Sequence, residues 1–187
     1  MRPPEEILLE RVSAGDSQAL AELYDRFSGM LLGLATKILG DRSDAEDVLQ
    51  EVFVQVWRQA GRYRRGRSSV STWLVLITRS RSIDRLRSRN VKRRTALAAH
   101  REEPSAHTSP EGVRIVLRDE RRKRLSGALA ELPEKQRKVL EMAYYQGLTQ
   151  REIAEATETP LGTVKTRTLL AMRKLRQTLE DEIEELL

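Results

Sequence analysis

One segment of the sequence concentrates side chains that bind phosphates. Residues 58–101 contain 14 Lys and Arg against a single acid, Asp84, which gives a net charge of +13. Residues 1–57 carry −6 and residues 102–187 carry −1. A charge this concentrated attracts polyanions, because binding releases the counterions condensed on them. A solvated like-charge run is the alternative, but the apolar stretch Trp73–Ile77 inside the segment must be buried, which favours a nucleic-acid partner.

A second set of polar side chains, near the C-terminus, has the pattern of a DNA-reading helix. Thr149 and Glu152 have the spacing of a capping box, and residues 157–160 form a short turn before another helix. Two helices joined by such a turn form a helix-turn-helix, whose second helix enters the major groove. Lys and Arg can bind guanine there, and Thr can contact a thymine methyl or a phosphate. The side chains expected to point outward at this helix start are Thr163, Lys165, Thr166 and Arg167.

Other kinds of chemistry have little support in the sequence. There is no cysteine, which excludes disulfides, thiolate zinc sites and cysteine nucleophiles. The only histidines, His100 and His107, have no catalytic partner pattern nearby, and no glycine-rich phosphate loop occurs. A zinc site from both histidines with Glu102 or Glu103 is a weaker interpretation than a solvated segment. We therefore predict no enzyme, no cofactor and no metal site.

The elements that position these side chains are predicted to be helices. Residues 5–103 lack proline, β-branched and aromatic residues are sparse, and Ala, Leu, Glu, Arg and Gln dominate. Residues 95–117 contain both histidines and two prolines, which is typical of a flexible linker. The sequence thus predicts an all-α protein of two small helical domains, residues 1–94 and 118–187, joined by the linker 95–117.

Local signals place the individual helices. One helix is expected from Asp16 to Ile38, ended by Gly40, and the next begins with a capping box formed by Ser43 and Glu46. Opposite its apolar stripe it carries an acidic side. A basic loop over residues 61–71 leads to a helix from Thr72 to about residue 90. In the C-terminal domain, helices are expected over 118–132, 134–146, 149–156 and from 160 onward, the last capped by Thr159.

Several of these segments resemble a known protein family. Residues 44–53 (DAEDVLQEVF), Thr72-Trp73-Leu74 and Asp84-Arg85-Leu86-Arg87 resemble the N-terminal domain of bacterial RNA polymerase sigma factors. Leu132-Pro133-Glu134, Glu152-Ile153-Ala154 and residues 162–167 (GTVKTR) resemble the C-terminal one. The short two-domain layout is similar to the extracytoplasmic-function (ECF) group of the sigma-70 family. The resemblance covers nearly the whole chain outside the linker.

The resemblance implies roles for named residues. The acidic side of the second helix is implied to dock on core RNA polymerase, through Asp44, Asp47, Gln50 and Glu51. The basic loop and the helix after it are implied to recognise the −10 promoter element, with an extruded base held by the loop. The residues in this set are Tyr63, Arg64, Arg65, Ser80, Arg81, Arg85 and Arg89. Ser80 stands where the family often has Asn. For Trp73, a place in the core is favoured over a role as a stacking platform.

The helix-turn-helix is implied to recognise the −35 element, through Thr149, Thr163, Lys165, Thr166 and Arg167. Implied partners are core RNA polymerase, promoter DNA and an anti-sigma factor. Without an apolar leader or a membrane-spanning run, we expect a cytoplasmic protein with no membrane insertion.

Two alternative functions remain open from the sequence. One is a helix-turn-helix regulator of the response-regulator kind, although residues 1–92 lack the strand-helix alternation of a receiver domain. The other is a polymerase-binding inhibitor.

Overall fold

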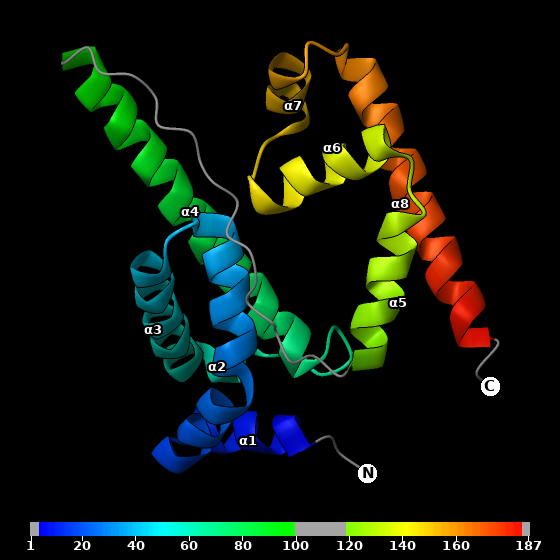
Figure 1. Ribbon diagram of the computed structural model, residues 1–187. Helices are drawn as coiled ribbons and strands as arrows, with labels where there is room; N and C mark the ends of the chain where they lie inside the picture. Colours follow the sequence, from blue (N-terminus) through cyan, green and yellow to red (C-terminus); the bar gives the residue numbers. More distant parts are fainter. Residues whose placement is uncertain (1–3, 100–118, 185–187) are drawn as a thin grey trace. The chain divides into compact units, whose positions relative to one another are not determined.

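The computed structural model describes the backbone of residues 4–99 and 119–184, with side chains for 4–91 and 125–179. The chain divides into two compact units, Met1–Ile115 and Val116–Leu187, and each is described by itself. Every regular element in the described ranges is helical, which confirms the predicted fold class (Figure 1). Within those ranges, no helix has both the length and the apolar character needed to cross a membrane.

The N-terminal unit is a four-helix arrangement around one core. Its helices are α1 (Pro4–Ser13), α2 (Ser17–Leu39), α3 (Arg42–Gln59) and α4 (Val70–Ala99), with a 3-10 turn at Ala60–Arg62. Both α3 and α4 pack against α2 and against each other (Figure 1). The core residues without any exposed surface include Leu23, Leu31, Val48, Val52, Val56 and Leu74. This core fixes which sides of α3 and α4 remain outside.

The start of α2 follows the sequence prediction. The Asp16 carboxylate caps the helix by accepting hydrogen bonds from the backbone N–H groups of Gln18 at 2.9 Å and Ala19 at 3.1 Å. Arg11 of α1 forms an ion pair with the same carboxylate at 2.8 Å. The Ala19 hydrogen bond, followed by the Arg11 contact, lowers the pKa of Asp16 below its ordinary value. Gly40 ends the helix with a φ of 69°, in the region that favours glycine.

The predicted capping box at Ser43 is wrong. The α3 helix begins at Arg42, and its cap is Asp41, whose Oδ1 accepts the N–H of Asp44 at 2.8 Å. Asp is as good a cap as Ser, and Asp41 comes two residues earlier, so Ser43 lies inside the first turn.

The first helix, α1, was not anticipated. Leu8, Leu9 and Val12 share one buried face of it and join the core of the unit. Their spacing is a helical signal, but it spans only three turns between Pro4 and Gly15. The signal was therefore present in the sequence, although short.

The α4 helix is longer than expected at both ends. It begins at Val70, where the Ser69 hydroxyl accepts the N–H of Thr72 at 3.2 Å, and it extends to Ala99 rather than ending near residue 90. Residues 95–99, expected in the linker, thus belong to this helix, which contains neither Gly nor Pro. The rest of the expected linker, residues 100–117 with both histidines, lies outside the described residues.

Two polar side chains in α4 are completely buried. The Thr78 hydroxyl donates to the carbonyl of Leu74 at 2.9 Å, and the Ser82 hydroxyl donates to that of Thr78 at 2.8 Å. Each hydroxyl is therefore satisfied within its own helix. Trp73 packs partly buried against the core, which confirms the core interpretation of that residue.

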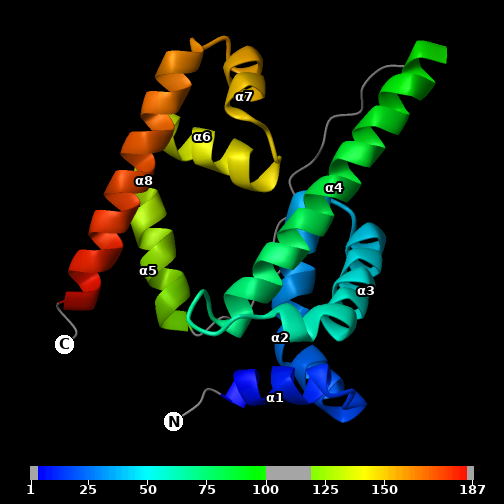
Figure 2. The ribbon, with the colours of Figure 1, turned by 180° about the vertical axis from the view of Figure 1, so that it is seen from behind.

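The C-terminal unit contains α5 (Asp119–Ala130), α6 (Glu134–Tyr145), α7 (Gln150–Ala156) and α8 (Leu161–Glu184). Helices α6 and α7 lie beside the N-terminal half of α8 (Figure 2). Their core is small, with Val139, Met142, Ile153 and Val164 at its centre. Gly147, with a φ of 64°, lets the chain turn from α6 toward α7 as predicted.

Candidate functional site

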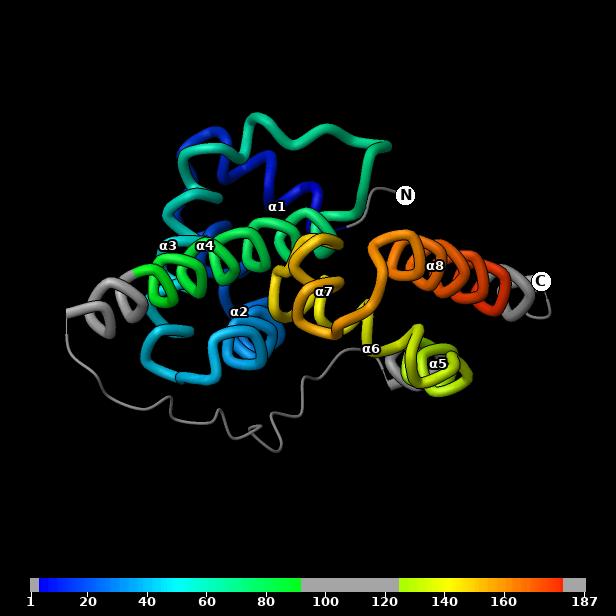
Figure 3. Tube along the Cα trace, turned by 90° about the horizontal axis from the view of Figure 1, so that it is seen from above, coloured from blue at the N-terminus to red at the C-terminus, as the bar shows by residue number. Residues whose placement is uncertain are grey.

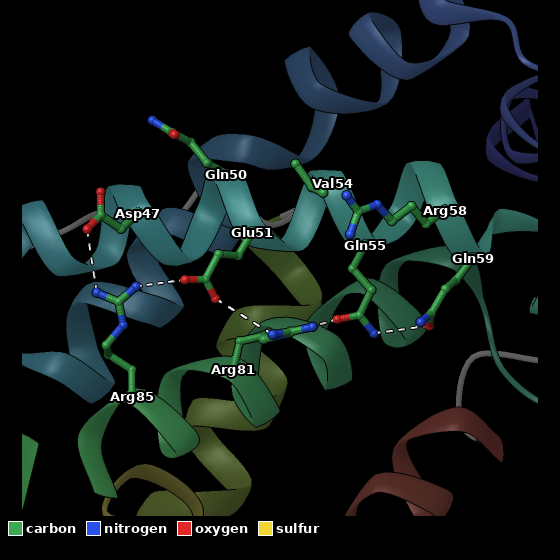
Figure 4. Close-up of a pocket in the computed structure, with 9 residues that line it drawn as sticks. All are labelled: Asp47, Gln50, Glu51, Val54, Gln55, Arg58, Gln59, Arg81 and Arg85. Carbon is green, nitrogen blue, oxygen red and sulfur yellow. Dashed lines mark hydrogen bonds and ion pairs between the residues drawn. The ribbon is translucent and has the colours of Figure 1, made fainter. Parts of the chain in front are cut away.

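A charged groove runs between α3 and α4 (Figure 4). Arg85 of α4 lies at one end of it, with guanidinium nitrogens 2.7 Å from Glu51 Oε1, 3.5 Å from Asp47 Oδ2 and 3.3 Å from Asp44 Oδ1. Its neighbour Arg81 contacts Glu51 at 3.8 Å and donates to Gln55 Oε1 at 2.9 Å. The groove has a volume of about 460 Å³.

The arginine series continues beyond the groove. Arg89 forms an ion pair with Asp44 at 2.6 Å and donates to the carbonyl of Leu39 at 3.4 Å. Asp44 thus accepts hydrogen bonds from two guanidinium groups on α4, at different carboxylate oxygens. Arg89 thus connects α4 to the end of α2, through Leu39, and to the first turn of α3, through Asp44.

These contacts join two sets of residues that the sequence analysis assigned to different partners. Asp44, Asp47 and Glu51 were expected to face polymerase, and Arg81, Arg85 and Arg89 were expected to face DNA. In the structure the two sets contact each other. The hydrogen bond with Glu51 is the largest cause that raises the pKa of Arg85, so its cationic form is stabilised in place. The helical spacing of the opposite charges on the two helices is visible in the sequence, but that spacing alone does not show that these two faces pack together.

Four further residues line the groove that the sequence analysis did not select, namely Val54, Gln55, Arg58 and Gln59. Val54 is 50% exposed, although it is an apolar residue in the middle of α3. Gln50 lies beside it and is also exposed (Figure 4). The outer side of α3 therefore offers an apolar side chain and an amide, with carboxylates beside them, to a partner molecule.

The basic loop after α3 is tied to α1. The Tyr63 hydroxyl donates to the carbonyl of Ser68 at 2.7 Å and lies 3.5 Å from Glu6 Oε1. Arg65 forms ion pairs with Glu6 at 3.3 Å and with Glu10. Burial, and then the charge of Glu6, raise the pKa of Tyr63. The loop runs beside α1 in the view from above (Figure 3), so α1 contributes to its shape.

The remaining candidates near this loop are placed differently. The Tyr63 ring meets Trp73 edge to face, with ring centroids 5.8 Å apart. Arg64 and Ser80 are exposed, the first in the loop and the second on α4. Glu6 and Glu10 were missed by the sequence analysis, because nothing local to α1 relates it to a loop more than fifty residues away.

The helix-turn-helix has the predicted geometry at its start. The Thr149 hydroxyl accepts the N–H of Glu152 at 3.3 Å, and the Glu152 carboxylate accepts the N–H of Thr149 at 2.7 Å. This confirms the capping box of α7. Glu158 lies in the turn with a φ of 48°, and Thr159 donates to the carbonyl of Thr157 at 3.1 Å.

The candidate reading residues lie at the N-terminal end of α8. Val164 and Ala171 are buried, so the opposite side of the helix is outside the small core. Lys165 and Thr166 are exposed, while Thr163 and Arg167 are half-buried. Within the described part of the chain, neither Lys165 nor Arg167 has an ion pair or a side-chain hydrogen bond. Thr166 donates to the carbonyl of Gly162 at 2.9 Å.

The described side chains hold no group of three His, Asp or Glu residues arranged for a metal ion. His100 and His107 lie outside the described residues. The structure thus places the candidate chemistry in three surfaces: the α3–α4 groove, the loop beside α1, and the N-terminal end of α8.

Comparison with known proteins gives matches to both units. Residues 23–91 match the family model described as Sigma-70 region 2, and residues 122–175 match the one described as Sigma-70, region 4. These ranges contain all the candidate residues named in the sequence analysis.

Relatives match over most of the chain. An ECF RNA polymerase sigma factor SigK from Mycolicibacterium vanbaalenii is 34% identical over 92% of this chain and 87% of its own length. SigK of Mycobacterium tuberculosis is 31% identical over 92% of each chain. Among solved structures, SigE of Rhodobacter sphaeroides in complex with the anti-sigma ChrR is 31% identical, with a TM-score of 0.47 over 95% of this chain and 99% of that one.

Proposed function

The chain belongs to the ECF group of sigma-70 RNA polymerase sigma factors, and on that premise we propose which of its surfaces carries each part of the work. As a sigma factor, it binds core RNA polymerase and directs the initiation of transcription at specific promoters. The match of residues 23–91 to region 2 decides against a response-regulator type of protein. We further propose that the protein has a regulatory role and catalyses no reaction of its own.

The polymerase-docking surface is proposed to be the outer side of α3, formed by Asp44, Asp47, Gln50 and Glu51. Two of its carboxylates, Asp47 and Glu51, stand beside exposed Val54 and Gln50 in one open groove, and Asp44 lies one turn before Asp47 on α3. Asp47 and Glu51 stay about half exposed beside their ion pairs, so they can still accept hydrogen bonds from a basic partner, and the apolar side chain would be buried on contact. We refer to these four residues as the acidic docking surface.

Recognition of the −10 element is proposed for the loop after α3 and the adjoining helix, with Tyr63, Arg64, Arg65 and Ser80 nearest the base. The exposed guanidinium of Arg64 is available to stack on a base or bind a phosphate. The sequence analysis also assigned Arg81, Arg85 and Arg89 to this task, but all three form ion pairs with carboxylates of α3.

Recognition of the −35 element is proposed for α7 and α8, through Thr149, Thr163, Lys165, Thr166 and Arg167. One observation carries this assignment: Lys165 and Arg167 stand at the first turns of α8 with no ion pair among the described residues. Their donors are available for guanine or phosphate at the end of the helix that enters the major groove.

Two further parts of the proposal concern organisation. We propose that the N-terminal unit and residues 118–187 fold independently, on either side of a linker that follows the end of α4 at Ala99. An anti-sigma factor is proposed as a further partner, as expected of the family.

Transcription in vitro with core polymerase tests the assignment of the two readers. The templates are a promoter library randomised at both elements, and the variants are Arg167→Ala and, as a matched control on α8, Arg173→Ala. A base contact contributes about 1–3 kcal/mol of discrimination, so Arg167→Ala should lower transcription from intact −35 promoters by roughly ten- to a hundredfold. The control should stay near wild type.

The pattern of the loss identifies the kind of contact. If Arg167 binds only phosphate, the loss will be similar for all −35 sequences and smaller at low salt. In either case the −10 preference should not change. A shift in −10 preference with none at −35 would overturn the assignment.

A further inference from the structure

Three arginines on α4 share one face of the helix. Arg81, Arg85 and Arg89 are four residues apart, so their side chains project in nearly the same direction. That direction is toward α3, as Figure 4 shows for Arg81 and Arg85. Every ion pair described above for these three residues is with a carboxylate of α3.

Arg85 is poorly placed to hold a phosphate. Its side chain is only 28% exposed, and its two terminal nitrogens already contact Asp44, Asp47 and Glu51. A phosphate arriving there would have to displace carboxylates that belong to the same protein and stand at hydrogen-bond distance. It would also meet the repulsion of the carboxylates that stayed.

The same ion pairs fix the positions of the carboxylates on α3. Asp47 and Glu51 are one turn apart, and like charges at this spacing repel each other. Arg85 lies between them and fixes both, Arg81 holds the second oxygen of Glu51, and Arg89 holds the second oxygen of Asp44. Side chains ordered before binding cost less to order on binding.

We propose that Arg85, flanked by Arg81 and Arg89, is a positioning residue for the acidic docking surface and not a contact to promoter phosphate. Asp47 and Glu51 are about half exposed, and ion pairs with such carboxylates add little to folding stability, so the main effect is on the geometry of the surface. The planar fork of arginine is required, because one guanidinium must address two carboxylates at once. The inference rests on the proposed docking role of α3.

A double-mutant cycle measures the effect on polymerase binding. The variants are Arg85→Gln, Glu51→Gln and the two combined, and the measurement is the affinity of the labelled full chain for core polymerase. Each single change should weaken binding about three- to tenfold. If Arg85 acts through the carboxylates, the double variant should bind core polymerase only slightly less tightly than the single variant with the lower affinity. Arg85→Lys keeps the charge without the fork and should recover only part of the affinity.

The salt dependence of DNA binding tests the other half of the proposal. The holoenzyme is titrated with a single-stranded −10 oligonucleotide at several salt concentrations. Loss of one phosphate contact on a single strand lowers the slope of log affinity against log salt by about 0.7. Arg85→Gln should keep the wild-type slope. Arg64→Gln removes an exposed guanidinium from the loop and is the matched comparison, with a lower slope expected.

The outcomes separate the two proposals. Additive losses in the cycle, or a lower salt slope for Arg85→Gln, would overturn the positioning role. If Glu51→Gln weakens polymerase binding and Arg85→Gln does not, the positioning role alone is wrong. If Glu51→Gln has wild-type affinity, the docking surface is wrong and the inference fails with it. Thermal unfolding checks each variant, and Arg81→Gln, which also removes a contact with Glu51, takes the place of Arg85→Gln if the latter does not fold.

Discussion

The two units of the protein prepare their charged surfaces in opposite ways. In the N-terminal unit, arginines of α4 and of the basic loop are bound to carboxylates of α3 and α1. In the C-terminal unit, Lys165 and Arg167 have no ion pair among the described residues, and the ion pair of Arg137 with Glu141 at 4.0 Å joins neighbours within α6. The charged surfaces of the N-terminal unit are thus organised by internal ion pairs. The reading residues of α8 are positioned only by a helix cap and a small core.

The two units also differ in the size of their hydrophobic cores. The N-terminal core draws on four helices, whereas the central cluster of the C-terminal unit contains Val139, Met142, Ile153 and Val164. A small core buries little apolar surface, so shortening one of its side chains removes a large share of the stability of the unit. The contrast therefore predicts where each unit is vulnerable.

The largest expected effect comes from Ile153→Ala. Ile153 is fully buried, and removing a buried Ile side chain of this size costs about 2–5 kcal/mol. Hydrogen exchange of the full chain should then show lost protection in α6, α7 and α8, with α2, α3 and α4 unchanged. Ile153→Val is the graded control, with a cost of about 0.5–1.5 kcal/mol. Loss of protection in both units together would contradict their independent folding.

A smaller effect is expected from Glu6→Gln, which tests the internal contacts of the N-terminal unit. The Glu6 side chain is 18% exposed and contacts both Tyr63 and Arg65. After a discount for solvent screening, its loss should cost about 0.5–1 kcal/mol locally. Amide exchange over residues 63–69 should rise about two- to fivefold. Glu5→Gln is the control on the same helix, since Glu5 pairs with Arg26 of α2 instead. An equal rise in both variants would remove the specific role of Glu6.

The smallest effect concerns pH. The pKa of Asp16 is lower in the folded state than in the unfolded state. As the pH falls, the Asp16 carboxylate is therefore protonated at a higher pH in the unfolded chain than in the folded one. Its stabilising effect is present above the unfolded value of about 3.9 and is lost as the pH drops through the lower folded value. Asn can still cap a helix but carries no charge, so Asp16→Asn should be less stable than wild type at pH 7, with the difference shrinking toward pH 3.

Urea unfolding of the N-terminal unit at a series of pH values checks this expectation. Asp25→Asn is the matched control, since Asp25 is exposed on the same helix and caps nothing. A difference that stayed constant with pH would mean that the Asp16 charge does not contribute.

How much of the fold the sequence predicted depends on how local the determining contacts are. The start of a helix at Asp16 and the capping box of Thr149 and Glu152 depend on only three or four neighbouring residues, and both were predicted correctly. Ser43 failed because two good caps stood two residues apart and local signals could not choose between them. The end of α4 was also misplaced, because no Gly or Pro stands near residue 90, where the helix was expected to end.

The candidate site was predicted in its residues but not in its pairing. Sequence showed charge on α3 and on α4, and both were assigned to outside partners. Whether Arg85 faces solvent or Glu51 depends on how two helices pack on α2, which no local pattern contains. The contacts of Glu6 with the loop were out of reach for the same reason.

The two buried hydroxyls of α4 have a consequence for how this protein can change over evolutionary time. Thr78, Ser82, Arg85 and Arg89 follow one another at intervals of four, three and four residues, so they share a stripe along α4. Thr78 and Ser82 make their hydrogen bonds within the helix, and an alanine at either position leaves no partner stranded in the interior. A leucine there has no room, and it would push α4 outward and pull the arginines off the carboxylates of α3. These two positions can therefore accept other side chains that are no larger than the native ones, and the small side chains act as spacers that keep the neighbouring arginines of α4 in register with the carboxylates of α3.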